Sequence, residues 1–355
     1  MEILETESNV VVLNAQPEFT AKTKEKINAD YFILCEEKMA IDPKNSLVAG
    51  VPVLSWVARA CEKKPKVLPC KDGENVLDII KPYLSDAEYS VVLYSNTPLV
   101  TKNHIKDLLG FVMTKRMNAC KLKKGYVFNN SYISNVDEVY SVDTYDFSSN
   151  DFFEVKSIED LAVAEGYLQN RIFAYHSRNG VSFESARNLC IDASVEIGSG
   201  TMIATDVSLF GNTTIGVNVK LGENVTIKNS KIGNDVTIAD NSVVIGSIIK
   251  DGTIIRENVI IDSSAIMSGV KIDKCAKVLS TKIRENAHIA ELAEIFNSRI
   301  AENVSVGVAS KVIGENIPAL VMQNAEIGAA SVVLDASVPA GNIVRSGEIR
   351  QGGEQ

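Results

Sequence analysis

The chain contains three histidines, the side chains best suited to act as a general base near neutral pH. His288 lies beside Glu285 and Glu291 in the sequence, so it could take a proton from a substrate. A solvated or corner histidine is nevertheless the favoured interpretation of His288. His104, at the start of an expected helix, and His176, at the end of another, occupy ordinary capping or surface positions.

The six cysteines are scattered, with no Cys-x-x-Cys spacing and no histidine cluster beside them. This distribution indicates reduced, mostly buried thiols, and neither a disulfide framework nor a zinc site. We therefore expect no metal and no cofactor. The cysteines are Cys35, Cys61, Cys70, Cys120, Cys190 and Cys275.

The composition is that of an acidic protein, with a formal net charge of −9 and a pI near 5.1 over 355 residues. Such a charge disfavours nonspecific binding to nucleic acid or to anionic membranes. The first residues are acidic and lack the basic region of a signal peptide, and no apolar run reaches the length of a membrane span. The sequence therefore predicts a soluble cytoplasmic protein that contacts neither nucleic acid nor membrane.

The second half of the chain has a short, fixed repeat. Isoleucine, leucine and valine recur every six residues from Ile191 to Ile227, and then in steps of six, six and five residues to Val312. A 3.6-residue helical period does not explain this spacing, and the hairpin signals of an antiparallel β domain are missing. The repeat predicts a parallel β-helix, in which each turn stacks on the next and none could bury its apolar face alone.

The repeat also predicts how each turn is built. About 18 residues per turn suit a triangular coil of three short strands, and about eight turns would make a rod about 40 Å long. Small hydroxyl residues recur every 17 positions and should stack as a ladder along one edge. These residues are Ser230, Ser247, Ser264, Thr281 and Ser298.

The first half has a different pattern, that of a parallel sheet. The apolar runs Val10–Leu13 and Ser90–Tyr94 are typical of strands buried on both faces. Helical patterns lie at about 54–62, 76–84 and 103–117, and a capping-box signal at Ser157 opens a helix that runs to about His176. The predicted organisation is an α/β domain (1–156), a linker helix and connection (157–188), the β-helix (189–345) and a flexible tail (346–355).

These features resemble one family. The segments Asp42-Pro43-Lys44 and Leu93-Tyr94-Ser95-Asn96-Thr97-Pro98-Leu99, together with Cys190–Gly198 in the first coils, are similar to motifs of the bifunctional N-acetylglucosamine-1-phosphate uridyltransferase/glucosamine-1-phosphate acetyltransferases. The resemblance is good from about 179 to 312 and patchy from 10 to 120. It implies a shortened nucleotidyltransferase-like parallel sheet followed by a left-handed parallel β-helix of hexapeptide repeats.

The resemblance also assigns candidate site residues. Leu13 and Ala15 correspond to the nucleotide-binding loop, but this stretch has Gln16 and Glu18 where the family has glycines, with Pro17 between them, and no glycine precedes residue 50. A loop without glycine approaches phosphates poorly, because side chains stand in the way.

Two further positions of the nucleotidyltransferase-like half are assigned to the substrate. Lys44 is retained as a phosphate-contacting cation, with a solvated surface lysine as the equal alternative. Asn96 replaces the family's metal-binding aspartate, and a neutral amide is a poor ligand for a hard cation.

The acetyltransferase half departs from the family pattern as well. Val308 falls at the family's catalytic histidine, and Phe296 and Asn297 fall at lysines that bind the sugar phosphate. Two hypotheses follow: a non-catalytic scaffold or regulatory subunit that has lost both activities, which we favour, or an active, diverged nucleotidyl- or acyltransferase. A nucleotide sugar is a possible ligand in either case.

The resemblance further implies a homotrimer built through the β-helix. The apolar residues outside the inward register are expected to supply the trimer face. These residues are Val243, Ile248, Ile254, Ile260 and Met267.

Overall fold

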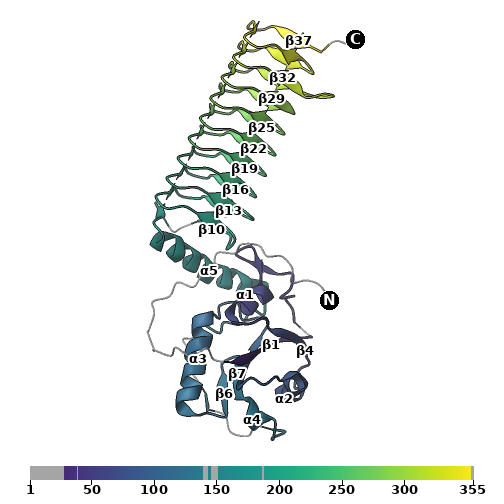
Figure 1. The fold of residues 1–355 in the computed structure, drawn as a ribbon, viewed down its shortest axis with the longest axis vertical. Helices are drawn as coiled ribbons and strands as arrows, with labels where there is room; N and C mark the ends of the chain where they lie inside the picture. Colours follow the sequence, from purple (N-terminus) through teal and green to yellow (C-terminus); the bar gives the residue numbers. More distant parts are fainter. Residues whose placement is uncertain (1–27, 38, 139–142, 145–150, 186–187, 353–355) are drawn as a thin grey trace. The chain divides into compact units, whose positions relative to one another are not determined.

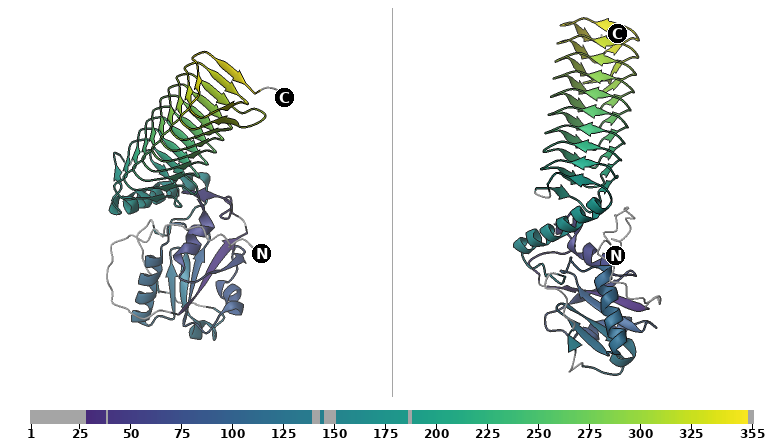
Figure 2. Two further views of the ribbon diagram at one scale, coloured as in Figure 1. Left: turned by 45° about the horizontal axis from the view of Figure 1, so that its top comes forward. Right: turned by 90° about the vertical axis from the view of Figure 1, so that its left-hand side faces the viewer.

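The computed structural model describes residues 28–37, 39–138, 143–144, 151–185 and 188–352. The chain divides into two compact units near residue 171. One unit is an α/β domain and the other is a long coil of short parallel strands (Figures 1 and 2). No helix in the described ranges is long and apolar enough to cross a membrane.

The α/β unit is built on a six-stranded sheet with the order β4-β1-β5-β7-β6-β8. Strands β4, β1 and β5 are parallel, as predicted, whereas β7 runs antiparallel to both β5 and β6. The strands are β1 (Ala29–Glu36), β4 (Lys66–Cys70), β5 (Tyr89–Tyr94), β6 (Ala119–Leu122), β7 (Gly125–Asn129) and β8 (Asp143–Thr144), and a separate small hairpin joins β2 (Leu47–Val48) to β3 (Val51–Pro52).

The antiparallel part of the sheet results from a tight hairpin that the sequence analysis missed. Only Lys123 and Lys124 separate β6 from β7, a connection too short for any parallel crossover. Gly125, with φ of 136°, follows the turn, and a Cβ there would lie 2.5 Å from the carbonyl oxygen of Val92. The sheet is therefore mixed, and the prediction of an entirely parallel sheet is corrected at this edge.

Strand β1 was not predicted from the sequence, in which Val10–Leu13 was expected to form the first strand. It lies between β4 and β5, and its central residues Phe32, Ile33 and Leu34 are fully buried. Residues 10–13 lie outside the described part of the chain. Because β1 directly precedes the Asp42-Pro43-Lys44 segment, it is the strand from which that segment leads.

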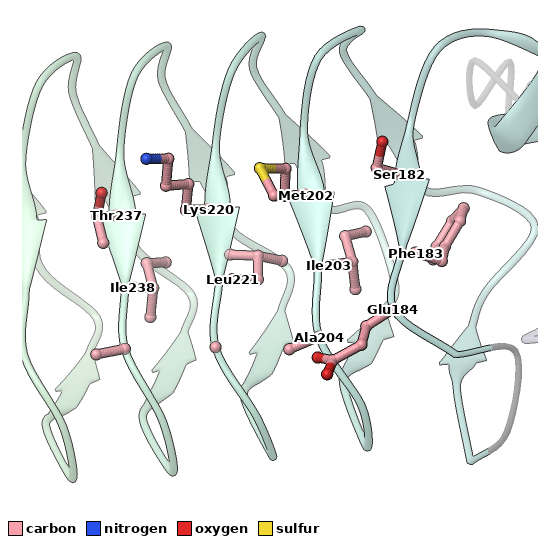
Figure 3. Close-up of a pocket in the computed structure, with 12 residues that line it drawn as sticks. Ser182, Phe183, Glu184, Met202, Ile203, Ala204, Lys220, Leu221, Thr237 and Ile238 are labelled. Carbon is pink, nitrogen blue, oxygen red and sulfur yellow. The ribbon is translucent and has the colours of Figure 1, made fainter.

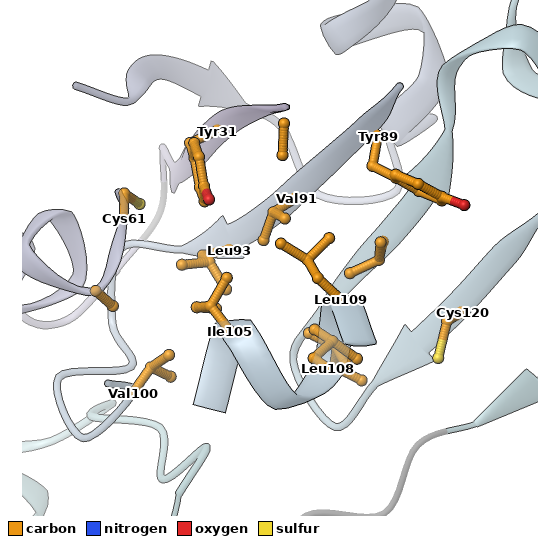
Figure 4. Close-up of a cluster of buried hydrophobic side chains, with 14 of the residues drawn as sticks. Tyr31, Cys61, Tyr89, Val91, Leu93, Val100, Ile105, Leu108, Leu109 and Cys120 are labelled. Carbon is orange, nitrogen blue, oxygen red and sulfur yellow. The ribbon is translucent and has the colours of Figure 1, made fainter. Parts of the chain in front are cut away.

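Helices cover both faces of this sheet. The helices are α1 (Val53–Ala60), α2 (Val76–Ile80), the 3₁₀ turn η1 (Lys81–Tyr83), α3 (Lys102–Lys115) and α4 (Asn130–Ile133). Side chains of α1 and α3 pack on one face around Ile33, Val91 and Leu93 (Figure 4), and those of α2 and α4 pack on the other. The three predicted helices are confirmed within a few residues.

Helix α5 (Ile158–Arg178) begins with the predicted capping box. The Ser157 hydroxyl accepts from the Asp160 amide at 3.2 Å, and the Asp160 carboxylate accepts from the Ser157 amide at 3.0 Å. These bonds satisfy amides that a helix start leaves without partners.

The coil consists of three parallel sheets, one on each side of a triangular cross-section. The first face has the strands β10 (Cys190–Ile191), β13 (Ser208–Phe210), β16 (Thr226–Lys228), β19 (Val243–Ile245), β22 (Ile260–Asp262), β25 (Lys277–Leu279), β28 (Glu294–Phe296), β31 (Lys311–Ile313), β34 (Val332–Leu334) and β37 (Ile349–Gln351).

The second face has the strands β11 (Glu196–Ile197), β14 (Thr214–Ile215), β17 (Lys231–Ile232), β20 (Ile248–Ile249), β23 (Ala265–Ile266), β26 (Lys282–Ile283), β29 (Ser298–Ile300), β32 (Ala319–Val321) and β35 (Ser337–Val338). The third face has the strands β9 (Ser182–Phe183), β12 (Met202–Ile203), β15 (Lys220–Leu221), β18 (Thr237–Ile238), β21 (Ile254–Ile255), β24 (Lys271–Ile272), β27 (His288–Ile289), β30 (Ser305–Val306), β33 (Glu326–Ile327) and β36 (Ile343–Val344).

The coil confirms the predicted parallel β-helix and is longer than expected. Two of its sheets have ten strands, against about eight predicted turns. Strand β9 starts before residue 189, and β37 lies within the segment 346–355 that we predict as a flexible tail. Sequence spacing at these ends is less regular, so the repeat underestimates the length of the coil.

The hydroxyl ladder is present as predicted. The Ser264 amide donates to the Ser247 hydroxyl at 3.0 Å, and the Thr281 amide donates to the Ser264 hydroxyl at 3.0 Å. Each hydroxyl in turn donates to a carbonyl two residues earlier, as Ser264 does to Asp262 at 2.7 Å. The ladder therefore satisfies buried backbone amides at a corner where the strands have ended.

The five residues expected to form a trimer face do not share a face. Val243 and Ile260 point outward from the first face, Ile248 and Met267 lie on the second, and Ile254 lies on the third. A step of six or five residues moves to the next side of the triangle, so outward residues at such spacing are distributed around the coil. This prediction is corrected.

Candidate functional site

The carboxyl ends of β1 and β5 meet at one edge of the α/β sheet, where parallel sheets commonly bind ligands. Asn96 lies two residues beyond the end of β5 and is 2% exposed. Its amide nitrogen and oxygen are both buried without a hydrogen-bond partner in the described chain, while its backbone oxygen accepts from the Val155 amide at 2.8 Å. A buried amide without partners is costly, so this side chain is a candidate contact for a ligand.

Lys44 is near the same edge. Its side chain is exposed, and its backbone amide donates to the Asp42 carboxylate at 3.0 Å. Burial raises the pKa of the Cys35 thiol, and the Ser95 hydroxyl and the charge of Lys44 oppose that rise. Lys44 and Ser95 both lower the pKa of the Cys35 thiol, so both lie near it. Lys44 is therefore on the same side of the sheet as the end of β5, which is followed by Ser95 and Asn96.

An ion-pair network occupies the rest of this edge. The Lys124 ammonium lies 2.8 Å from Glu36 Oε1 and 3.5 Å from Glu154 Oε2, and Lys156 lies 3.0 Å from the same Glu154 oxygen. Lys124 also lies over the ring of Tyr94, 4.4 Å from its centroid. Burial alone would lower the pKa of Lys124, but its hydrogen bond to Glu36 and the charge of Glu154 raise it above the ordinary value. Lys124 is thus held as a cation by carboxylates.

This network is the part of the site that the sequence analysis missed. Glu36 and Lys124 are 88 residues apart, and no local motif links them. The hairpin between β6 and β7 places Lys124 beside the end of β1, and only the strand order makes them neighbours.

The two predicted nucleotide-binding residues, Leu13 and Ala15, lie outside the described residues. The segment that does lead from β1 to Lys44 also lacks glycine and carries Glu36 and Glu37. No group of three or more His, Cys, Asp or Glu side chains in the described part of the chain could hold a metal ion.

Within the described part of the coil, a histidine and an aspartate contact each other on the surface. His288 Nε2 lies 2.6 Å from Asp273 Oδ2, and both side chains are partly exposed. His288 belongs to β27 on the third face, so the pair is accessible from outside the coil.

The three positions that correspond to the family's acetyltransferase residues carry no titratable group. Val308, at the position of the catalytic histidine, is 45% exposed, and Phe296 is 41% exposed. The Asn297 side chain donates to the Gly314 carbonyl at 2.9 Å within the coil. None of the three can accept a proton or supply a positive charge to a sugar phosphate.

A groove of about 540 Å³ crosses the third face over β9, β12, β15 and β18. Its lining includes the small residues Ala204, Gly222 and Ala239, which leave room above the strands. The side chains of Met202 and Lys220 stand along one side of it, and the Glu184 carboxylate extends toward Ala204 (Figure 3). The groove is therefore mainly apolar, with opposite charges at its margins.

Comparison with known proteins supports the resemblance stated above. The chain is 35% identical over 92 residues to bifunctional protein GlmU of Alkaliphilus metalliredigens, 39% over 94 residues to that of Lactobacillus johnsonii and 34% over 112 residues to that of Listeria welshimeri. The chain is similar to bifunctional GlmU proteins. These matches cover 26, 22 and 28% of this chain and only 19, 20 and 24% of the GlmU proteins. No family model matches the chain.

Two solved structures share 18% sequence identity with this chain. LpxA of Acinetobacter baumannii has a TM-score of 0.28, covering 43% of this chain and 69% of its own. A hexapeptide transferase family protein of Anaplasma phagocytophilum has a TM-score of 0.15, covering 49% of this chain and 80% of its own. The description of the coil as a parallel β-helix therefore depends on its own strand registers, and the similarity to GlmU proteins on sequence.

Proposed function

We propose that this GlmU-like chain is a non-catalytic scaffold or regulatory subunit of sugar-nucleotide metabolism. The observation that carries the proposal is the Lys124 network at the carboxyl edge of the sheet. Nucleotidyl transfer requires cations and backbone amides that face a triphosphate. In this chain the cation Lys124 is instead paired with the carboxylates of Glu36 and Glu154. Carboxylates at this position would repel a phosphate, and Asn96 offers only a neutral amide.

The coil supplies the scaffold in this proposal. Its stacked strands form a rigid surface, and we expect three copies to assemble through it into a homotrimer. The acidic composition and the free cysteines favour action in the cytoplasm. Light scattering coupled to size-exclusion chromatography tests the assembly, because a strictly monomeric protein would contradict the scaffold role.

Ligand binding is tested by thermal shift of the full chain with UTP, UDP-N-acetylglucosamine, sugar phosphates and acetyl-CoA, each with and without magnesium. A bifunctional GlmU protein serves as the positive control. We expect no shift for this chain at concentrations that stabilise the control, since only a ligand that binds the folded state raises the melting temperature. A shift that Lys44→Ala abolishes would show that the sheet edge binds nucleotide sugars and would overturn the proposal.

An active transferase is the second candidate, and the His288–Asp273 pair favours it. A carboxylate that holds one ring nitrogen fixes the orientation of the imidazole, as a general base requires. Under this alternative, His288→Gln and Asp273→Asn would each lower acyl transfer to an amino sugar. The matched control is Lys271→Gln, since Lys271 lies beside His288 in the strand register of the same face. Equal rates in all three variants would remove the argument for this candidate.

A further inference from the structure

One side of the coil differs in charge from the rest of this acidic chain. On the second face, the residues before and after each inward anchor point outward in two rows. Between β14 and β35 these rows contain no Asp or Glu among the described residues, although the chain has 45 acidic residues. They contain five exposed basic side chains, which we call the basic face: Lys231, Lys250, Lys282, Arg284 and Arg299.

The basic face is continuous across neighbouring turns. Lys282 pairs in register with Arg299 of the next turn, and Arg284 continues the same strand, its amide donating to the Ile300 carbonyl at 2.8 Å. Exposed apolar side chains accompany the charges: Ile248, 42% exposed, lies one turn after Lys231, and Met322, 44% exposed, lies one turn beyond Arg299. No ion pair within the described part of the chain involves any of the five basic residues.

We propose that the basic face binds residues 2–11 of this same chain. This segment has Glu2, Glu5 and Glu7 as its only charged side chains, interspersed with Ile3 and Leu4 and followed by two valines. Its acidic and apolar composition therefore complements a face that is basic and apolar.

The dimensions of the two partners also agree. In an extended chain, Glu2 and Glu7 lie about 17 Å apart. Lys231 and Arg299 are four turns apart on the coil, which at the usual strand spacing is about 19 Å. One extended segment can thus place its three carboxylates along the row of cations. A second copy of the coil is the less favoured occupant, because two basic faces would repel each other.

Zero-length coupling of carboxylates to lysines by a carbodiimide tests the proposal on the unmodified full chain. Peptide mass spectrometry should find Glu2, Glu5 or Glu7 coupled to Lys231, Lys250 or Lys282 in about fivefold higher yield than to Lys220 or Lys271. Lys220 and Lys271 are matched controls, because both are exposed lysines that point outward from the third face. Mixing isotopically labelled and unlabelled chains separates coupling within one copy, which is expected, from coupling between copies, which would overturn the assignment of the segment to the same chain.

A pair of variants separates electrostatic docking from chance proximity. Arg284→Glu combined with Arg299→Glu leaves the coupled lysines in place and should lower the coupling yield at Lys282 several-fold. About 0.5 M salt should lower that coupling yield as well, because it screens the attraction between the charges. Arg256→Glu on the third face should not change it. Equal coupling of the acidic segment to the lysines of both faces would overturn the proposal. So would coupling of the basic face to carboxylates of another coil, or of a foreign acidic partner, in place of residues 2–11.

Discussion

The hydroxyl ladder offers the sharpest test of how the coil is held together, through the substitution Ser264→Ala. Ser264 is 5% exposed, and its hydroxyl accepts from the Thr281 amide at 3.0 Å and donates to the Asp262 carbonyl at 2.7 Å. Alanine removes one net hydrogen bond, worth about 1 kcal/mol, and leaves a buried amide without a partner, which costs about 1–3 kcal/mol. We therefore expect a loss of about 2–4 kcal/mol in the free energy of unfolding.

Two readouts make this prediction refutable. Denaturant unfolding of the coil should show a lower midpoint, and hydrogen exchange should show a faster Thr281 amide, since that amide loses its acceptor. Ser264→Thr retains the hydroxyl and should stay close to wild type, because Thr281 occupies the same register one turn later. Ser305→Ala, at an exposed outward position, is the control for a harmless substitution. An unchanged midpoint together with an equally protected Thr281 amide in Ser264→Ala would refute the role assigned to the ladder.

Three further predictions concern other parts of the molecule. His176 is 2% exposed, its Nδ1 has no partner within the described residues, and burial lowers its pKa from 6.5 to about 4. The imidazole therefore binds a proton more readily in the unfolded chain, and the free energy of unfolding falls as the pH drops from about 6.5 to 4. His176→Gln should accordingly reduce the difference in Tm between pH 7 and pH 5. Leu292 is 56% exposed at a left-handed corner with φ of 60°, where earlier turns have Asn241 and Asn258. Because asparagine tolerates this backbone conformation better than leucine, Leu292→Asn should raise the free energy of unfolding by about 1 kcal/mol. The control Leu320→Asn, in a strand, should not raise it. Lys124→Met should lower the Tm more than Lys156→Met, because Lys124 lies half-buried between two carboxylates while Lys156 is largely exposed.

The coil was predictable because every turn repeats the same physical requirement. Each inward position such as Ile261 must fill the same triangular interior, so the period is visible in the sequence without any partner information. The ladder from Ser230 to Ser298 was predictable for the same reason. The ends of the coil were not, because terminal turns have fewer neighbours and depart from the repeat.

The sheet edge was less predictable because its neighbours come from distant parts of the chain. The run Tyr31–Cys35 pairs with β5 but was not predicted as a strand, because local composition does not show which apolar runs become neighbours in a sheet. Asn96 and Lys44 were identified through motif resemblance alone. Lys124 became a candidate only once the hairpin had placed it beside Glu36, which no spacing in the sequence indicates.

The corner insertion near Gly314 has a consequence for how this coil can change in length. Turn registers advance by 17 residues through most of the coil, as from Lys282 to Arg299, but by 21 from Arg299 to Leu320. The additional residues leave the strand pairing on both sides intact, so corners absorb changes that strands cannot. Duplication of a whole turn would extend the coil by about 4.8 Å while every other turn kept its contacts. The length of the coil can therefore change only by whole turns, while its triangular cross-section stays the same.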